Sequence, residues 1–354
     1  MIILGIETSC DETSAAIIEG NKSDKKVKLV SNVVASSLSL HSKTGGIIPE
    51  VAARQQIKYI IPVIKKALVK DIDAIAITYG PGLIGSLLVG VETAKTLSYV
   101  WKKPIIPVNH LIGHIYSNFI DNDKITFPFI GLITSGAHTD LLLFKSHDKY
   151  IWLGGTRDDA AGECFDKCAR LLGYDYPGGP KISELAERGN LERFKLPSPL
   201  INSKDFDFSF SGLKTAFFRL ANQHFPITKT DVHSNGFQWQ QIDLEKTLSQ
   251  SELQTLCDLC ASLQKSIVDV LVIKTLKAAQ KYNVKSILLC GGVAANQKLR
   301  NAFKAQSSKL KVDFFVPQKN LCTDNAAMIA TTAFFKYKPL PWRKITANPE
   351  LYFD

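Results

Sequence analysis

The stretch MIILGIETSCDETSAAII, residues 1–18, contains two apolar runs separated by a short polar segment. Residues 127–144, FPFIGLITSGAHTDLLLF, repeat this order, and in both copies the first run ends in Gly-x-x-Thr-Ser. Two apolar runs around a tight polar turn predict a β-hairpin. Two such hairpins far apart in one chain predict an internal repeat, with two α/β lobes of like fold facing one another.

Strand and helix patterns alternate around these hairpins. Residues 26–37 and 72–80 have strand character, and residues 51–69 and 83–101 have helical periodicity. Later in the chain, residues 284–303 predict a buried strand, a turn at Gly291-Gly292 and a helix that starts near Ala294. The fold class is therefore α/β.

Length and composition narrow the class of protein. A chain of 354 residues is long enough for two domains, and its 45% hydrophobic content is that of a water-soluble globular protein, with no run of about 18 apolar residues to cross a membrane. Lys and Arg outnumber the acids 43 to 33, which suits a polyanionic partner such as nucleic acid. Seven scattered cysteines indicate a reducing compartment, and we interpret Cys257 and Cys260 as core thiols of a helix. Because the chain opens directly on a strand pattern, we expect no leader peptide and a cytoplasmic location.

His110 and His114 are four residues apart in IIPVNHLIGHIYSNF, residues 105–119. On a helix this spacing places two imidazoles on one face, where they can bind one metal ion. In the zinc-protease motif a Glu follows the first His, but here that residue is Leu111. Two satisfied histidines in a core remain an alternative to a metal site. Asp324, just before a predicted helix, is either its N-cap or the third metal ligand.

Each hairpin turn is rich in small polar residues. Hydroxyls of Ser9, Thr13 and Ser14 in the first turn, and Thr134 and Ser135 with Gly136 in the second, can combine with backbone N–H groups to bind phosphate. Ordinary turn chemistry is the alternative for either copy alone. The Gly291-Gly292 turn lets a flat ligand approach the backbone, with Asn296 placed to hydrogen-bond it.

Eight segments together resemble one known family: GIETSCDETSAA, GPGLIGSLLVG, NHLIGH, DDAAGECFDK, YPGGP, DFSFSGLKT, CGGVAAN and CTDNAAMIA. The chain is similar to the TsaD family of tRNA adenosine threonylcarbamoyltransferases, in its bacterial form, from Ile3 to about Ala333. The resemblance implies an actin-like ATPase (ASKHA) fold with a ligand cleft between two lobes. It also implies transfer of threonylcarbamoyl from threonylcarbamoyl-AMP to the exocyclic amine of the adenosine on the 3′ side of the anticodon, in tRNAs that read codons starting with A.

Family roles map onto individual residues. The resemblance implies that one iron or zinc ion is bound by His110, His114 and Asp324. It implies contacts to the adenylate phosphate from Ile133, Thr134, Ser135, Gly136 and Ala137, and contacts to the nucleoside from Asp166, Gly179 and Asn296. Asp11 and Glu12 are candidates for the base that takes a proton from the amine, or alternatively are ordinary turn carboxylates.

The sequence departs from the family pattern at a few positions. Ala137 stands where a second glycine is usual, Gln56 where His is common, and Ser183 where Asp is frequent. Residues 221–251 form a longer segment than in many relatives, and we interpret them as a surface insertion.

The resemblance extends to organisation and partners. We expect a first lobe of residues 1–112 with 325–345 and a second lobe of residues 113–324. TsaB-like and TsaE-like subunits are the expected protein partners, with the TsaB-like subunit on the helix of residues 83–101. The rival functions are an actin-like small-molecule kinase, a metalloprotease and a non-catalytic scaffold.

Overall fold

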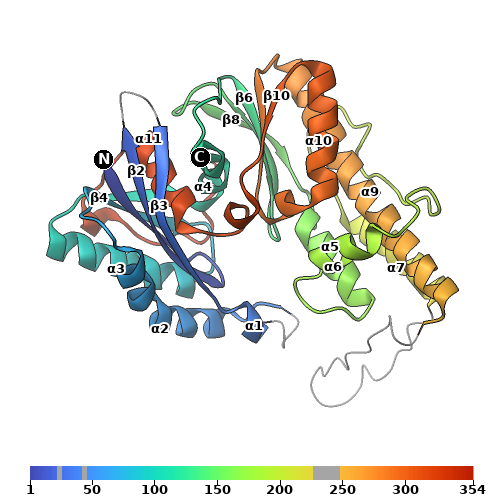
Figure 1. Cartoon of the computed structure of the whole chain (residues 1–354), viewed down its shortest axis with the longest axis horizontal. Coiled ribbons are helices and arrows are strands. Elements are labelled where there is room, and N and C mark those ends of the chain that lie inside the picture. Colours follow the sequence, from blue (N-terminus) through green and yellow to red (C-terminus); the bar gives the residue numbers. More distant parts are fainter. Residues whose placement is uncertain (22–25, 42–45, 226–247, 354) are drawn as a thin grey trace.

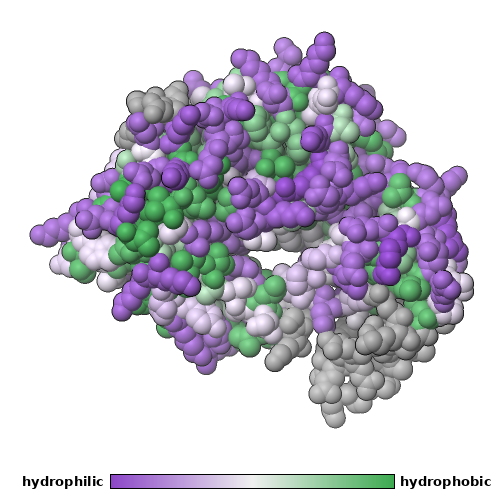
Figure 2. Space-filling view, in the orientation of Figure 1, coloured by the Kyte–Doolittle hydropathy of each residue, from purple (hydrophilic) through white to green (hydrophobic). Residues whose placement is uncertain are grey.

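The computed structural model describes residues 1–21, 26–41, 46–225 and 248–353. These residues form two lobes, each built on a five-stranded sheet (Figure 1). In the space-filling view an opening separates the lower parts of the two lobes (Figure 2).

The first sheet has the strand order β3-β2-β1-β4-β5. β1 (Ile2–Glu7), β2 (Glu12–Asn21) and β3 (Lys26–Ser36) are antiparallel, and β4 (Ala74–Gly80) and β5 (Ile105–Asn109) continue the sheet in parallel with β1. The predicted opening hairpin is thus confirmed as the centre of this sheet.

The second sheet repeats that arrangement. β6 (Phe129–Thr134), β7 (Thr139–Phe144) and β8 (Tyr150–Gly155) are antiparallel, and β9 (Ser286–Cys290) and β10 (Asp313–Phe315) lie parallel to β6. The order β10-β9-β6-β7-β8 matches the first sheet strand for strand, which confirms the predicted internal repeat.

Helices cover both faces of the first sheet. Alternate residues of a strand point to opposite faces: Leu4 and Ile6 of β1 pack with α2 (Pro49–Ala67) and α3 (Ile84–Trp101), whereas Ile3 packs with α11 (Ala326–Phe335) on the other face. Both faces are therefore buried, as the unbroken apolar pattern of β1 requires. The short α1 (Leu38–His41) follows β3.

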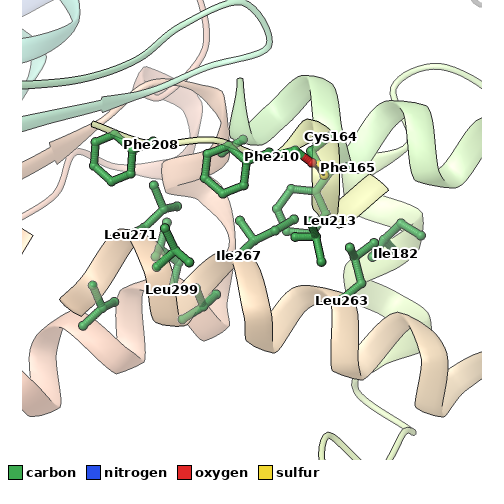
Figure 3. Packing of buried hydrophobic residues seen from close by; sticks show 14 of the residues in the cluster. Cys164, Phe165, Ile182, Phe208, Phe210, Leu213, Leu263, Ile267, Leu271 and Leu299 are labelled. Atoms are coloured by element: carbon green, nitrogen blue, oxygen red, sulfur yellow. Dashed lines mark hydrogen bonds between the residues drawn. The ribbon is translucent and has the colours of Figure 1, made fainter. Parts of the chain in front are cut away.

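The second lobe is organised around one long helix, α9 (Gln250–Lys281). Its apolar side chains pack under the second sheet, and Figure 3 shows Phe208 and Phe210 beside Leu271 and Ile267 of this helix. Against it pack α6 (Gly179–Ala186), α7 (Ser211–His224) and α10 (Gln297–Leu310), and α5 (Ala161–Leu171) packs in turn against α6 and α7. Cys257 and Cys260 lie buried in α9, as predicted.

The junction of the lobes contains α4 (His110–Tyr116), which packs against α11 of the first lobe and β6 of the second. The turns η2 (Ser117–Phe119), η3 (Gly292–Ala295), η4 (Lys319–Leu321) and η5 (Trp342–Lys344) are 3₁₀ helices. The helix predicted to start near Ala294 begins instead at Gln297. A 3₁₀ turn and the N-cap Asn296 intervene, because the left-handed φ of 88° at Gly291 first redirects the chain.

Three further predictions concern membrane helices, the insertion and the lobe boundaries. No helix in the described part of the chain is both long and apolar enough to cross a membrane. The expected insertion at 221–251 falls mostly on residues 226–247, outside the described residues, and its ends belong to α7 and α9. The lobe boundaries, 1–112 with 325–345 and 113–324, stay a prediction.

Candidate functional site

Helix α4 places the two histidines directly at the carboxyl end of β5. Its N-cap is Asn109, whose Oδ1 accepts hydrogen bonds from the N–H groups of Leu111 at 2.8 Å and Ile112 at 3.2 Å. Such a cap satisfies amides that the first helical turn leaves unpaired and so fixes where the helix starts. His110 and His114 follow on successive turns, both buried, with ring centroids 4.7 Å apart.

Asp324 reaches the histidines from the far end of the chain. The N-cap of α11 is its neighbour Asn325, whose Oδ1 accepts from the Met328 N–H at 3.1 Å, so the cap alternative for Asp324 is wrong. Asp324 Oδ1 lies 3.1 Å from Nε2 of His114 and 3.5 Å from Nε2 of His110. One ligand atom from each of the three residues falls within 4.8 Å of the others.

Glu7 at the end of β1 orients His110 from behind. Its Oε2 lies 3.0 Å from His110 Nδ1 and accepts a hydrogen bond from Thr78 Oγ1 at 2.5 Å, while its Oε1 accepts from the Ser9 N–H. A carboxylate on one ring nitrogen fixes the tautomer and leaves the other nitrogen to bind a metal. Nε2 of His110 is thereby directed toward Asp324.

The charges of this cluster support one another. Burial acts to lower the pKa of His110, but the carboxylates of Asp324 and Glu7 outweigh it and raise that pKa to about 9. Burial lowers the pKa of His114. Burial opposes ionisation of Asp324, yet the two imidazoles hold its pKa below the usual range. The carboxylates of buried Glu7 and half-buried Asp324 thus attract positive charge to this cluster.

The unpaired atoms of the cluster fit a metal ion. Neither ring nitrogen of buried His114 makes a hydrogen bond of good geometry within the described residues, although its Nε2 lies 3.1 Å from Asp324 Oδ1. Buried polar atoms nearly always have partners, so Nε2, the nitrogen that faces Asp324, is a candidate metal ligand. Two imidazole nitrogens and a carboxylate oxygen suit zinc or ferrous iron. Buried Leu111 stands where a zinc protease carries its Glu, so that reaction lacks its base.

The hydroxyls of the opening loop have partners inside the protein or lie buried. The Ser14 hydroxyl accepts the Ala326 N–H at 2.9 Å at the start of α11 and donates to Asn32 Oδ1 at 3.4 Å, and its expected phosphate role stays a prediction. Thr13 lies buried within β2. Ser9 Oγ is 3.2 Å from His110 Nδ1 and therefore lies beside the candidate metal cluster of His110, His114 and Asp324.

Asp11 and Glu12, the two candidate bases, occupy this same loop. Burial, followed by the charges of Asp324 and Asp11, raises the pKa of Glu12 to about 10. Its Oε1 also accepts a hydrogen bond from Ser36 at 3.2 Å. This upward shift of the pKa disfavours Glu12 as the base, and both base assignments stay predictions.

The turn between β6 and β7 has an open tip. Ser135 Oγ accepts from the N–H groups of Ala137 at 3.4 Å and His138 at 3.0 Å, which closes the turn. A Cβ added at exposed Gly136 would meet nothing within 4 Å, so a ligand can approach its backbone. Of the five residues expected under the phosphate, Ile133 and Thr134 are buried in β6, and Gly136 and Ala137 are exposed.

Asp166 on α5 holds the start of α6. Its Oδ1 accepts from the N–H groups of Gly178 at 2.8 Å and Gly179 at 3.1 Å, while burial raises its pKa. The neighbouring Tyr176 has its pKa raised by burial and then by the charges of Asp11 and Asp166. Those two carboxylates come from the first and the second lobe, so the charges of both lobes act on Tyr176.

Asn296 is fully engaged inside the protein. Its Oδ1 caps α10 by accepting the Leu299 N–H at 2.9 Å, and its Nδ2 donates to Ser183 Oγ at 2.8 Å and Gln264 Oε1 at 2.7 Å. Ser183, which stands where Asp is frequent in the family, is thus hydrogen-bonded to the segment that follows the Gly291-Gly292 turn. Contact of Asn296 with a nucleoside stays a prediction.

Comparisons with known proteins place the chain in one family. The family model TsaD, tRNA N6-adenosine threonylcarbamoyltransferase, matches residues 28–331. A relative of that name from Syntrophomonas wolfei is 45% identical over 353 residues, which cover 98% of this chain and 96% of the relative. Another, from Thermosipho africanus, is 44% identical and covers 96% and 95%. The chain belongs to the TsaD family.

Solved structures outside the TsaD family share the fold. Full-length HypF in a phosphate- and nucleotide-bound form superposes with a TM-score of 0.57 at 13% identity, over 95% of this chain and 46% of HypF. HypF from T. kodakarensis gives a TM-score of 0.54 at 14% identity, over 95% and 47%. This chain thus spans just under half of HypF, and the likeness confirms the actin-like ATPase fold alone.

Three side chains of this candidate site had no role that could be assigned from the sequence: Glu7, Tyr176 and Gln56. In the sequence Glu7 is a single charged residue within an apolar run, and Tyr176 is the first residue of the YPGGP motif. Gln56, fully buried on α2, donates from Nε2 to the carbonyl oxygens of Cys10 at 2.8 Å and Glu12 at 3.2 Å. Its amide therefore holds the opening loop beside the metal cluster.

Proposed function

We propose that this chain transfers the threonylcarbamoyl group of threonylcarbamoyl-AMP to the exocyclic amine of the adenosine on the 3′ side of the anticodon, in tRNAs that read codons starting with A. Membership of the TsaD family makes the chain a tRNA-modifying transferase. The observation that carries the finer proposal is the meeting of His110, His114 and Asp324 at the junction of the lobes, the second of which contains the open turn at Gly136. His138 at the end of that turn is close enough to lower the pKa of Asp324.

The donor is already activated, so catalysis rests mainly on positioning and on stabilising the departing phosphate. In this proposal the exposed backbone at Gly136 and Ala137 binds the phosphate, and Asp166, Gly179 and Asn296 orient the nucleoside. Asp11 takes the proton that the amine loses on attack. A divalent ion, iron or zinc, when bound by His110, His114 and Asp324, supplies Lewis-acid stabilisation. No water needs activation, so the absence of a protease-type Glu is no obstacle.

The surface offers places for partners. The surplus of basic residues, 43 Lys and Arg against 33 acids, suits binding of the tRNA backbone. On α2 and α3, Ile57, Ile61, Ile84 and Leu88 are 64%, 46%, 50% and 45% exposed, and apolar residues are visible over this region in Figure 2. We propose this apolar patch as the docking face for a TsaB-like subunit. The proposal of a TsaE-like partner rests on the family resemblance alone. We also propose that the reaction takes place in the cytoplasm.

Asp324→Asn and Asn296→Asp separate the metal from the nucleoside end of the site. Asp324→Asn should lower metal content and donor affinity together, because an amide is a poorer ligand for a divalent ion. Asn296→Asp keeps the oxygen that caps α10 but loses both Nδ2 donors, so it should weaken donor binding with metal content unchanged. The measurements are elemental analysis and titration with a non-hydrolysable threonylcarbamoyl-adenylate analogue. Wild-type metal content in Asp324→Asn would contradict the proposed metal site.

A further inference from the structure

The C-terminal segment, residues 348–353, crosses from the first lobe to the second. At its start the Asn348 N–H donates to the carbonyl oxygen of Tyr79 at 2.7 Å, and the Gly82 N–H donates to that of Pro349 at 3.3 Å. At its end Phe353 packs against the apolar cluster formed by α4 and the second sheet. The segment therefore spans the junction that contains the candidate site.

Tyr352 contacts both halves of that site. Its carbonyl oxygen accepts a hydrogen bond from Asn109 Nδ2 at 2.7 Å. Its hydroxyl donates to Asp140 Oδ1, which also accepts from Trp152 Nε1 at 3.0 Å. The Trp152 and Tyr352 rings meet edge to face, with centroids 6.3 Å apart.

Each of these two contacts ends on a residue that fixes a functional element. Asn109 is the N-cap of α4, so its position determines where His110 and His114 lie. Asp140 is the cross-strand partner of Ile133, and its Oδ2 lies 3.6 Å from Nδ1 of His138 at the end of the turn that contains Gly136, so its side chain contacts the β6–β7 hairpin at this turn. One residue thus links the metal helix to the proposed phosphate turn.

We propose that Tyr352 is a positioning residue that sets the distance between the metal cluster and the β6–β7 turn. This inference rests on the proposed function, because it assigns the two ends of one donor to those two elements. A bound adenylate can meet both ends only when they are correctly spaced, and a misplacement of about 1 Å is enough to impair catalysis. The two hydrogen bonds of Tyr352 therefore affect binding of the donor rather than the stability of α4 or of the β6–β7 turn alone.

The two contacts can be removed separately. Tyr352→Phe keeps the ring and the carbonyl oxygen but loses the hydroxyl that reaches Asp140. Asn109→Ser keeps an N-cap oxygen for α4 but is too short to reach Tyr352. Tyr282→Phe is the matched control: it removes a hydroxyl from a ring at the C-terminal end of α9 that packs on Phe206.

Affinity for the non-hydrolysable threonylcarbamoyl-adenylate analogue is the decisive measurement. Tyr352→Phe should weaken it about tenfold, the loss expected for one hydrogen bond to a charged group. Metal content, melting temperature and tRNA affinity should stay at wild-type values. Asn109→Ser should weaken analogue binding in the same way, and the double variant should lose less than the product of the two effects, since both break one link.

Two outcomes would overturn the inference. If Tyr352→Phe binds the analogue as tightly as Tyr282→Phe does, the hydroxyl positions nothing. If melting temperature and metal content fall in step with affinity, the role is merely structural. Failure of the proposed function gives a different result: wild-type protein would then bind metal but not the analogue, and the positioning role would fall with it.

Discussion

At the scale of single residues, the sequence supports the metal cluster only in part. The spacing of His110 and His114 is local, so it could be predicted. The choice between cap and ligand for Asp324 depended on its neighbour Asn325, whose side chain takes the cap position. Glu7 could not be predicted, because its partner His110 is 103 residues away and a charge within a strand pattern has no local explanation.

Glu7→Gln tests the role of this carboxylate behind His110. The amide keeps the shape of the side chain but binds the imidazole less strongly and no longer adds negative charge. Removing such a partner typically costs about 10–100-fold in metal affinity. Competition against a chelator should show that loss, whereas Glu50→Gln, at an exposed acid on α2, should bind metal as wild type does. Unchanged affinity in Glu7→Gln would contradict the assigned role.

At the scale of elements, periodicity located the hairpins, α2, α3 and α9 because apolar spacing is a local property. It could not locate the start of α10, which follows the left-handed turn at Gly291 and a 3₁₀ segment. It also could not show how closely elements approach. β1 and α11 come from opposite ends of the chain, and Gly5 lies at their contact.

Gly5→Ala tests the approach of α11 to β1. A Cβ at Gly5 would lie 2.2 Å from the carbonyl oxygen of Ala326 and 3.0 Å from Ala330 Cβ, and backbone cannot move aside cheaply. We expect the free energy of unfolding to fall by about 1–3 kcal/mol in a urea titration. Gly212→Ala in α7, where an added Cβ meets nothing within 4 Å, should instead be neutral or gain about 0.5 kcal/mol. Equal stabilities for the two variants would show that the contact is looser than described.

At the scale of the whole molecule, the repeated hairpin predicted two like lobes, and both sheets have the same strand order. The contacts that join the two lobes could not be predicted from the pattern of apolar and polar residues. Tyr352 and Asp140 are 212 residues apart, and Asp324 meets His114 across nearly as long a separation. Such pairs depend on the packing of the finished fold rather than on any local rule, so the sequence indicated the parts of the site but not their alignment.

The central claim is that the cluster of His110, His114 and Asp324 serves transfer of threonylcarbamoyl to tRNA. The most direct measurement incubates the protein with an adenylate-forming enzyme, threonine, bicarbonate, ATP, the partner subunits and a tRNA transcript, and then quantifies modified adenosine by mass spectrometry of the nucleosides. We predict modification by wild-type protein and by His224→Ala, which alters an exposed histidine of α7, and a loss of at least about 100-fold with His114→Ala. Wild-type levels of modified adenosine with His114→Ala would contradict the account.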